Sequence, residues 1–207
     1  MTELYIIRHG RTFANEAGLK QGQINGENTY LNDMGKQQAQ NLAANFDLTG
    51  FDAIYVSPLQ RTRDTAAILN TQAQIPVYED ERILEISYGQ WDGHYNQELM
   101  DQYPEYFSDL TKDVNERYIE VATKGESFTD VEQRVADFVV AVTQKHPQGK
   151  IAVVTHGFTV RSFAINATKS SGTTILEPDN CSVTKILVDP ENGDQHVVYY
   201  NRGVSGF

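Results

Sequence analysis

The chain has 207 residues, of which 40% are hydrophobic and 22% charged, a composition typical of water-soluble globular proteins. Its formal net charge of −11 argues against nucleic acid as a partner, because phosphate backbones need a basic binding surface. No apolar stretch approaches the roughly 20 residues of a membrane helix, and no signal peptide precedes the first strand, so we expect a cytoplasmic protein without a membrane partner.

The first part of the chain alternates predicted strands and helices. An apolar strand over residues 3–9 is followed by a polar loop from Gly18 to Gly26, which we expect to line the site. A helix then begins at about Asn32, whose side chain can cap it. A second strand is predicted over 51–56, with a helix beginning near Pro58. The residues expected on the packed sides of these helices are Ala39, Leu42, Ala43, Phe46, Ala66, Ala67 and Leu69.

The segment from about 86 to 125 differs in character, because aromatic side chains alternate with charges and strand signals are absent. We expect a helical insertion here, with its aromatics forming a small satellite core and one or two of them bordering the substrate. The next helix can be capped by Ser127 or Thr129, and Thr129 with Glu132 fits a capping box.

A strand over 151–155 and a C-terminal hairpin around the turn 189–194 complete the chain. These elements predict one α/β domain over 1–207. We expect a mostly parallel central sheet with helices on both faces, the insertion over the carboxyl edge of the sheet, and the hairpin at its end. The only cysteine, Cys181, excludes an internal disulfide and is expected to be a small buried side chain.

Two histidines follow two of the predicted strands. Arg8-His9-Gly10 ends the first, and Thr155-His156-Gly157 ends the strand over 151–155. Ligands of open α/β sheets bind outside the carboxyl ends of the strands, so the two imidazoles can face one another across a single site. This arrangement suits phosphoryl transfer through a histidine.

A third strand-to-helix junction supplies a further cation. The strand over 51–56 runs into Ser57-Pro58-Leu59-Gln60-Arg61-Thr62, which places Arg61 beside a helix N-terminus, where phosphate binds readily. An exposed salt bridge is the alternative for Arg61, but its position at the end of a strand favours function.

Taken together, these motifs resemble the histidine phosphatase superfamily, also called the phosphoglycerate mutase-like family. The resemblance spans residues 4 to 207. The matching residues are Arg8-His9-Gly10, Thr12, Asn15, Ser57-Pro58-Leu59, Arg61-Thr62, Thr65-Ala66, Leu84-Glu85, Gly89, Trp91, Gly93 and Thr155-His156-Gly157.

The resemblance implies a set of site residues. A neutral imidazole can attack phosphorus and form a phosphohistidine, and His9 is the candidate nucleophile. Arg8, Arg61 and His156 are expected to hold the phosphoryl oxygens. Glu85 is singled out as the general acid by the resemblance alone. The resemblance further implies that a second set of residues contacts the substrate or lines the pocket, namely Asn15, Gln21, Gly22, Gly157 and Phe158.

Three functions fit these residues. A phosphatase that acts on small phosphorylated metabolites is favoured, because Glu85-Ile86-Ser87-Tyr88 and the segment to Gly93 resemble the phosphatase branch. A phosphoglycerate mutase primed by a bisphosphate shares the same core residues, and a non-catalytic phosphate-binding module is the third possibility. No metal-binding pattern is present, so we expect neither metal nor cofactor. The substrate and the oligomeric state stay open.

Overall fold

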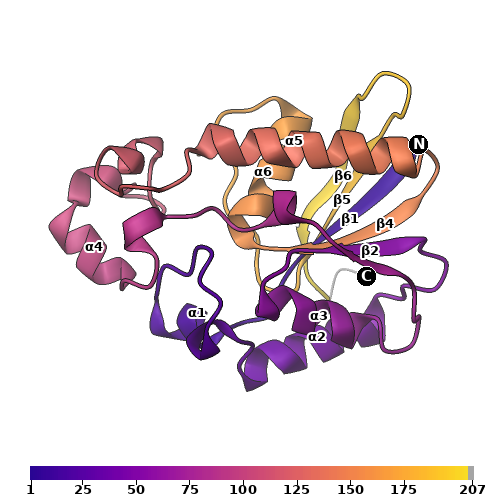
Figure 1. The fold of residues 1–207 in the computed structure, drawn as a ribbon, viewed down its shortest axis with the longest axis horizontal. Coiled ribbons are helices and arrows are strands. Elements are labelled where there is room, and N and C mark those ends of the chain that lie inside the picture. Colours follow the sequence, from indigo (N-terminus) through magenta and orange to yellow (C-terminus); the bar gives the residue numbers. More distant parts are fainter. Residues whose placement is uncertain (205–207) are drawn as a thin grey trace.

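A six-stranded sheet forms the centre of the computed structural model, which describes residues 1–204 (Figure 1). The strand order is β3-β2-β4-β1-β5-β6. Neighbouring strands are parallel from β3 to β1, whereas β5 runs antiparallel to both β1 and β6. The mostly parallel sheet and the C-terminal hairpin are therefore confirmed. The bounds of the strands are β1 (Thr2–Arg8), β2 (Ala53–Val56), β3 (Val77–Glu79), β4 (Lys150–Thr155), β5 (Val183–Val188) and β6 (Gln195–Arg202).

The two strands that lead to the histidines are direct neighbours at the centre of the sheet. β1 pairs with β4 in parallel, with Arg8 opposite Thr155. The apolar run of each strand is buried, as expected where helices cover both faces of a parallel sheet. The ladder continues one residue further, because the His9 N–H donates to the Thr155 carbonyl at 2.9 Å. Both histidines therefore leave the same edge of the sheet.

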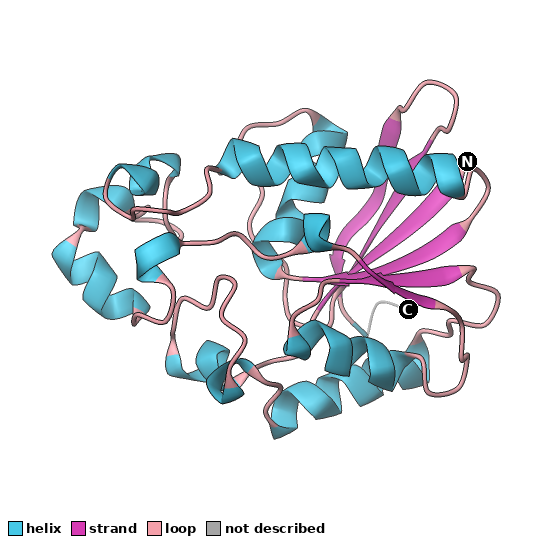
Figure 2. Ribbon diagram, viewed as in Figure 1, coloured by secondary structure: helices cyan, strands magenta, loops and turns pink. Residues whose placement is uncertain are grey.

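Helices cover the sheet on both faces, as predicted (Figure 2). On one face, α2 (Asp33–Asn45) and α3 (Gln60–Leu69) pack on a core that includes Ile7. On the other, α5 (Phe128–Lys145) and α6 (Gly157–Thr168) pack on a core that includes Ile6. This division follows from the alternation of side chains along β1. None of the helices in the described part of the chain is long and apolar enough to cross a membrane.

Asn32 caps α2 as expected, since its side chain accepts from the Gly35 N–H at 2.9 Å. At α5 the expected capping box is wrong, because Ser127 and Asp130 form the box in place of Thr129 and Glu132. The Ser127 backbone is extended, as a cap requires, and the helix begins at the next residue.

Two expectations for α3 are also corrected. The helix begins at Gln60 rather than near Pro58, and Ala67 is exposed rather than packed. The buried stripe of α3 follows Thr62, Thr65 and Leu69, at helical spacing, and Ala67 falls outside it.

The segment over 86–125 lies beyond the carboxyl ends of the parallel strands (Figure 1). It consists of α4 (Asn96–Gln102) and 3-10 turns rather than long helices. Its aromatics do not form a separate satellite core: Trp91 and Tyr118 pack near Phe128, whose ring lies 4.6 Å from that of Phe158. They belong to the same core as the sheet because α5 and α6 begin underneath them. The 3-10 turns of the segment are Gly89–Trp91, Pro104–Tyr106 and Glu116–Glu120.

A short helix, α1 (Phe13–Ala17), precedes the polar loop over 18–26, and backbone hydrogen bonds join this loop to the insertion. The Gly93 N–H donates to the Lys20 carbonyl at 2.7 Å, and the Lys20 N–H donates to the His94 carbonyl at 2.9 Å. The Asn96 N–H donates to the Gly18 carbonyl, also at 2.9 Å. Two further 3-10 turns lie at Glu27–Thr29 and Glu81–Ile83.

Candidate active site

His9 presents a neutral imidazole with one free nitrogen. Its Nδ1 lies 2.7 Å from the Gly10 carbonyl oxygen, and because a carbonyl only accepts, Nδ1 carries the hydrogen. Burial, followed by the charges of Arg61 and Arg8, holds the pKa of His9 well below the ordinary 6.5. The ring is therefore neutral at physiological pH, and the lone pair is on Nε2. A nitrogen in this state is a competent nucleophile.

His156 follows β4 and faces His9, with ring centroids 5.2 Å apart and planes at 66°. Its Nδ1 accepts a hydrogen bond from Nε of Arg61 at 3.2 Å, so the hydrogen of the neutral ring is on Nε2. That Nε2 donates to the Ser57 hydroxyl at 2.7 Å. Burial and the charge of Arg61 hold the pKa of His156 well below its ordinary value. His156 is thus held in one orientation beside the nucleophile, with its single N–H donated to Ser57.

Arg61 is almost fully buried, at 1% exposed. Beyond His156, its guanidinium donates to the carbonyl of Gly22 at 2.7 Å and to that of Ile24 at 3.0 Å. Burial lowers the pKa of Arg61 to about 10, so the side chain keeps its charge at neutral pH. Gly22 has a φ of +47°, and a β-carbon there would lie 1.8 Å from the Asp92 carboxylate. Glycine is therefore required where the loop holds Arg61.

Arg8 keeps a donor available. Its Nη1 donates to the Pro178 carbonyl, and its Nη2 lies 3.6 Å from the Glu177 carboxylate. Its Nε is buried and has no hydrogen-bond partner among residues 1–204. Because a buried, unsatisfied donor is costly, we expect this N–H to donate to an anionic oxygen of a ligand.

A cavity of about 230 Å³ opens beside Arg8. Asn15 and Gln21 line it, and Thr12 donates to both amide oxygens. The Thr12 N–H donates to Oδ1 of Asn15 at 3.1 Å, and the Thr12 hydroxyl donates to Oε1 of Gln21 at 2.9 Å. Because their oxygens are engaged, the NH₂ groups of the two amides are the ends left to bind a ligand. The cavity is lined by Arg8, Asn15, Leu19, Lys20, Gln21, Gly22, Glu85, Tyr88, Asn96, Lys112, Asp113 and Glu177.

Glu85 reaches the same cavity from the segment between β3 and the insertion, with 9% of its surface exposed. Its carboxylate accepts from the first turn of α6, with the Phe158 N–H at 3.3 Å and the Thr159 N–H at 3.2 Å. Arg134 of α5 fixes the backbone behind it, donating to the carbonyls of Leu84 and Glu85. The carboxylate is thereby held in one position at the wall of the cavity.

The last two residues of the predicted set lie at the start of α6. The Phe158 ring is fully buried against Phe128 and is not part of the lining of the cavity, which the resemblance had implied. Its backbone N–H holds Glu85 instead. Gly157 is also absent from the lining, but a β-carbon there would lie 2.1 Å from the Glu177 carboxylate and 3.0 Å from Cζ of Arg8. Its missing side chain leaves room for those two groups.

Several lining residues were not among the sequence-based candidates. Tyr88 is the insertion aromatic that borders the cavity, and the Lys20 ammonium lies 4.3 Å from its ring and 2.7 Å from Asp113. Lys20 could have been proposed because it is adjacent to Gln21 in the polar loop. No sequence signal marks Lys112, Asp113 or Glu177, since only the folded insertion and the segment before β5 bring them here.

The assembled groups suit phosphoryl chemistry. The neutral imidazole of His9 faces a second imidazole and is near the charges of Arg61 and Arg8, and the Glu85 carboxylate is near that of Arg61. Within residues 1–204, no cluster of three or more histidine, cysteine, aspartate or glutamate side chains could hold a metal ion. The charge that a metal would neutralise can be met here by arginines.

The comparisons with known proteins agree with this chemistry. The family model described as "Histidine phosphatase superfamily (branch 1)" matches residues 4–202. Phosphoserine phosphatase 1 of Hydrogenobacter thermophilus is 33% identical over 78% of this chain and 74% of its own. The adenosylcobalamin/alpha-ribazole phosphatase of Escherichia coli is 32% identical over 74% of this chain and 72% of its own. The structure of Bacillus stearothermophilus YhfR superposes with a TM-score of 0.85 at 29% identity, covering 98% of each chain.

Proposed function

Since this chain belongs to the histidine phosphatase superfamily and is a phosphatase, we propose that it hydrolyses small phosphorylated metabolites through a phosphohistidine on His9. The single observation that carries the proposal is the hydrogen bond between Nδ1 of His9 and the Gly10 carbonyl. It fixes the tautomer in which Nε2 holds a lone pair, in a ring that burial keeps neutral. If the hydrogen were on Nε2, that nitrogen would have no lone pair with which to attack phosphorus.

In the first step, the Nε2 lone pair forms a bond to phosphorus while the bond from phosphorus to the ester oxygen breaks. The negative charge on the phosphoryl oxygens is met by the guanidinium groups of Arg8 and Arg61, and His156 keeps Arg61 in place by accepting from its Nε. Donors already fixed by other hydrogen bonds need no reorganisation during the reaction, and such electrostatic stabilisation is often the largest contribution to catalysis.

Glu85 serves both halves of the reaction. In its acid form it gives a proton to the departing ester oxygen, and the carboxylate so formed then takes a proton from water as that water attacks phosphorus. The N–P bond breaks, inorganic phosphate leaves, and His9 returns to its neutral form. The hydrogen bonds from the first turn of α6 hold the carboxylate in place throughout.

The size and polarity of the cavity support a small polar substrate. About 230 Å³ has room for a small phosphate ester, and most of the lining side chains are polar. Phosphoserine and alpha-ribazole phosphate are suggested by the names of the two relatives. We propose phosphoserine or a comparably small ester, which this cavity and the one adjoining it can hold.

The test is phosphate release from p-nitrophenyl phosphate and phosphoserine without added bisphosphate, followed by detection of the intermediate. We expect a phosphate adduct on the peptide that carries His9 when turnover is stopped at alkaline pH, which preserves the N–P bond. His9→Ala should remove the adduct and lower kcat by several orders of magnitude, as loss of a covalent nucleophile does. Turnover by His9→Ala at more than about one per cent of wild type would refute the covalent route.

A further inference from the structure

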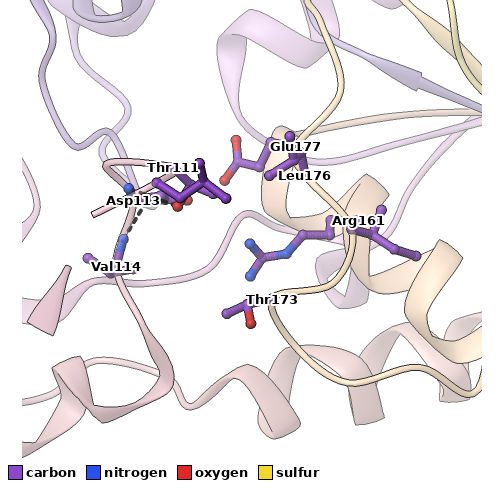
Figure 3. Close-up of a pocket in the computed structure, with 9 residues that line it drawn as sticks. Thr111, Asp113, Val114, Arg161, Thr173, Leu176 and Glu177 are labelled. Atoms are coloured by element: carbon purple, nitrogen blue, oxygen red, sulfur yellow. Dashed lines mark hydrogen bonds between the residues drawn. The ribbon is translucent and has the colours of Figure 1, made fainter. Parts of the chain in front are cut away.

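A second and larger cavity, of about 570 Å³, adjoins the cavity beside Arg8, and Asp113 and Glu177 line both. Its other walls come from the insertion, from α6 and from the segment that precedes β5 (Figure 3). Leu110, Val114, Ile175 and Leu176 make much of the lining apolar. The alcohol part of a phosphate ester bound at Arg8 can therefore extend into this space, which we call the head-group cavity.

Arg161 of α6 points into the head-group cavity (Figure 3). It is 4% exposed, and its guanidinium carbon lies 4.0 Å from the centroid of the Phe158 ring and 5.0 Å from that of Phe128. Its Nε and Nη2 are buried and make no hydrogen bond within the described part of the chain. Two aromatic rings thus hold the guanidinium while its donors are unsatisfied, which is costly unless a ligand meets them.

The two carboxylates of the cavity differ in their partners. Asp113 accepts from the Lys20 ammonium at 2.7 Å. Burial works to raise the pKa of Asp113, but Lys20 outweighs it and lowers that pKa. Glu177 has only the looser contact with Arg8, at 3.6 Å, and a phosphoryl group bound to Arg8 competes with that contact. When a substrate binds, Glu177 is therefore the carboxylate that lacks a cationic partner.

The charges select the kind of ligand. One guanidinium with unsatisfied donors suits a carboxylate, which it can bind through two parallel hydrogen bonds. A second phosphoryl group, with nearly two negative charges, would face Asp113 and Glu177 at short range. Burial and the proximity of Asp113 raise the pKa of Glu177 to about 7, and an adjacent ammonium would favour its charged form.

We propose that the head-group cavity binds the zwitterionic end of a phosphorylated amino acid, with Arg161 holding its carboxylate and Glu177 its ammonium. This assignment rests on the proposed phosphatase function and specifies its substrate class. It makes Arg161 and Glu177 determinants of specificity, with no part in the attack on phosphorus.

The wild-type protein can be tested with four esters that separate the two charges. Phosphoserine has both, 3-phosphoglycerate only the carboxylate, phosphoethanolamine only the ammonium, and ethylene glycol monophosphate neither. We expect kcat/KM to rise roughly 10- to 100-fold for each charge added, as charge-assisted hydrogen bonds do. Equal kcat/KM for all four would overturn the assignment, as would a preference for a bisphosphate over all of them.

Two variants assign the charges to side chains. Arg161→Met should reduce the preference for the two carboxylate esters to within about threefold. Glu177→Gln should reduce the preference for the two ammonium esters and leave the carboxylate preference intact. Arg63→Met is the matched control and should alter neither preference. Arg63 is an exposed arginine of α3 that pairs with Glu79.

The outcomes separate the two proposals. If wild type releases no phosphate from any ester, the phosphatase function itself fails. If it hydrolyses p-nitrophenyl phosphate but Arg161→Met keeps the full carboxylate preference, only the head-group assignment fails. Should Arg161→Met not fold, Arg161→Lys keeps the charge but loses the forked geometry, and an unchanged carboxylate preference in that variant would contradict the bidentate contact.

Discussion

Replacing Glu85 by glutamine tests the proton-transfer step, because the change is nearly isosteric. The amide oxygen can still accept from Ile86 and Thr159, at 3.1 and 3.2 Å. The NH₂ group then replaces the oxygen that accepts from the Phe158 N–H at 3.3 Å, so one hydrogen bond is lost. That loss costs about 1–3 kcal/mol of stability, which a domain with the usual 5–15 kcal/mol tolerates.

The effect on catalysis should be larger and should depend on the leaving group. Loss of a general acid costs about 10²- to 10⁴-fold in rate, or about 2.7–5.4 kcal/mol in the barrier. We expect this loss for an alkyl ester such as phosphoserine, whose leaving oxygen must be protonated. In phosphoenzyme formation p-nitrophenyl phosphate should lose much less, because its leaving group departs as a stable anion.

The assay is steady-state kcat for both esters, with burst kinetics to separate formation of the phosphoenzyme from its hydrolysis. Glu79→Gln is the matched control, since Glu79 is an exposed carboxylate paired with Arg63 at 2.8 Å. Equal losses in the rate of phosphoenzyme formation from both esters, in a variant that is folded at the assay temperature, would contradict the general-acid assignment. Glu85 would then have a positioning function, and the proton donor would have to be another group.

Three further predictions concern charge, metal and pH. Arg61→Ala should slow both esters alike, by roughly 10²- to 10³-fold, because phosphoryl charge is present whatever the leaving group; unequal losses would contradict this. Treatment with a chelator should leave phosphate release unchanged, and a loss restored by zinc or magnesium would mean that a metal supplies the stabilisation assigned to the arginines. Because the pKa values of His9 and His156 lie below the ordinary 6.5 in the folded state, unfolding takes up protons below pH 6.5. Stability should therefore fall as pH drops below 6.5, by about 1.4 kcal/mol per pH unit for each histidine, and His156→Gln should show a shallower slope in denaturant titrations at pH 5 to 7.

The sequence predicted the central architecture well because its signals are local. An apolar run of four residues, followed closely by His9 or His156, predicts a buried strand with a polar group at its carboxyl end. This prediction does not depend on the rest of the chain. The parallel pairing of β1 and β4 then brings the two histidines together. Arg61 was predictable for the same reason, since it lies in the first turn of the helix that follows β2.

The remaining parts depend on contacts that no local pattern encodes. Nothing in the sequence around Glu177 or Asp113 marks them, and both reach the site only through irregular segments that fold over it. The resemblance implied that Phe158 lines the pocket, whereas the first turn of α6 directs its ring into the core. The capping box of α5 was displaced by two residues because Ser127 and Thr129 are equally good caps by residue type.

The backbone hydrogen bonds between the loop over 18–26 and the insertion have a consequence for protein engineering. Lys20 is bonded on both sides to the segment around Gly93 and His94, and the same loop supplies Gly22, whose carbonyl holds Arg61. A change in the backbone of the insertion would therefore also move the loop that positions Arg61. An insertion transplanted from another phosphatase would have to bring its own partner loop, or the exchange would disturb the arginine that stabilises the reaction. Single side-chain substitutions within the insertion should be the best way to alter substrate range, because they leave the backbone hydrogen bonds to the loop intact.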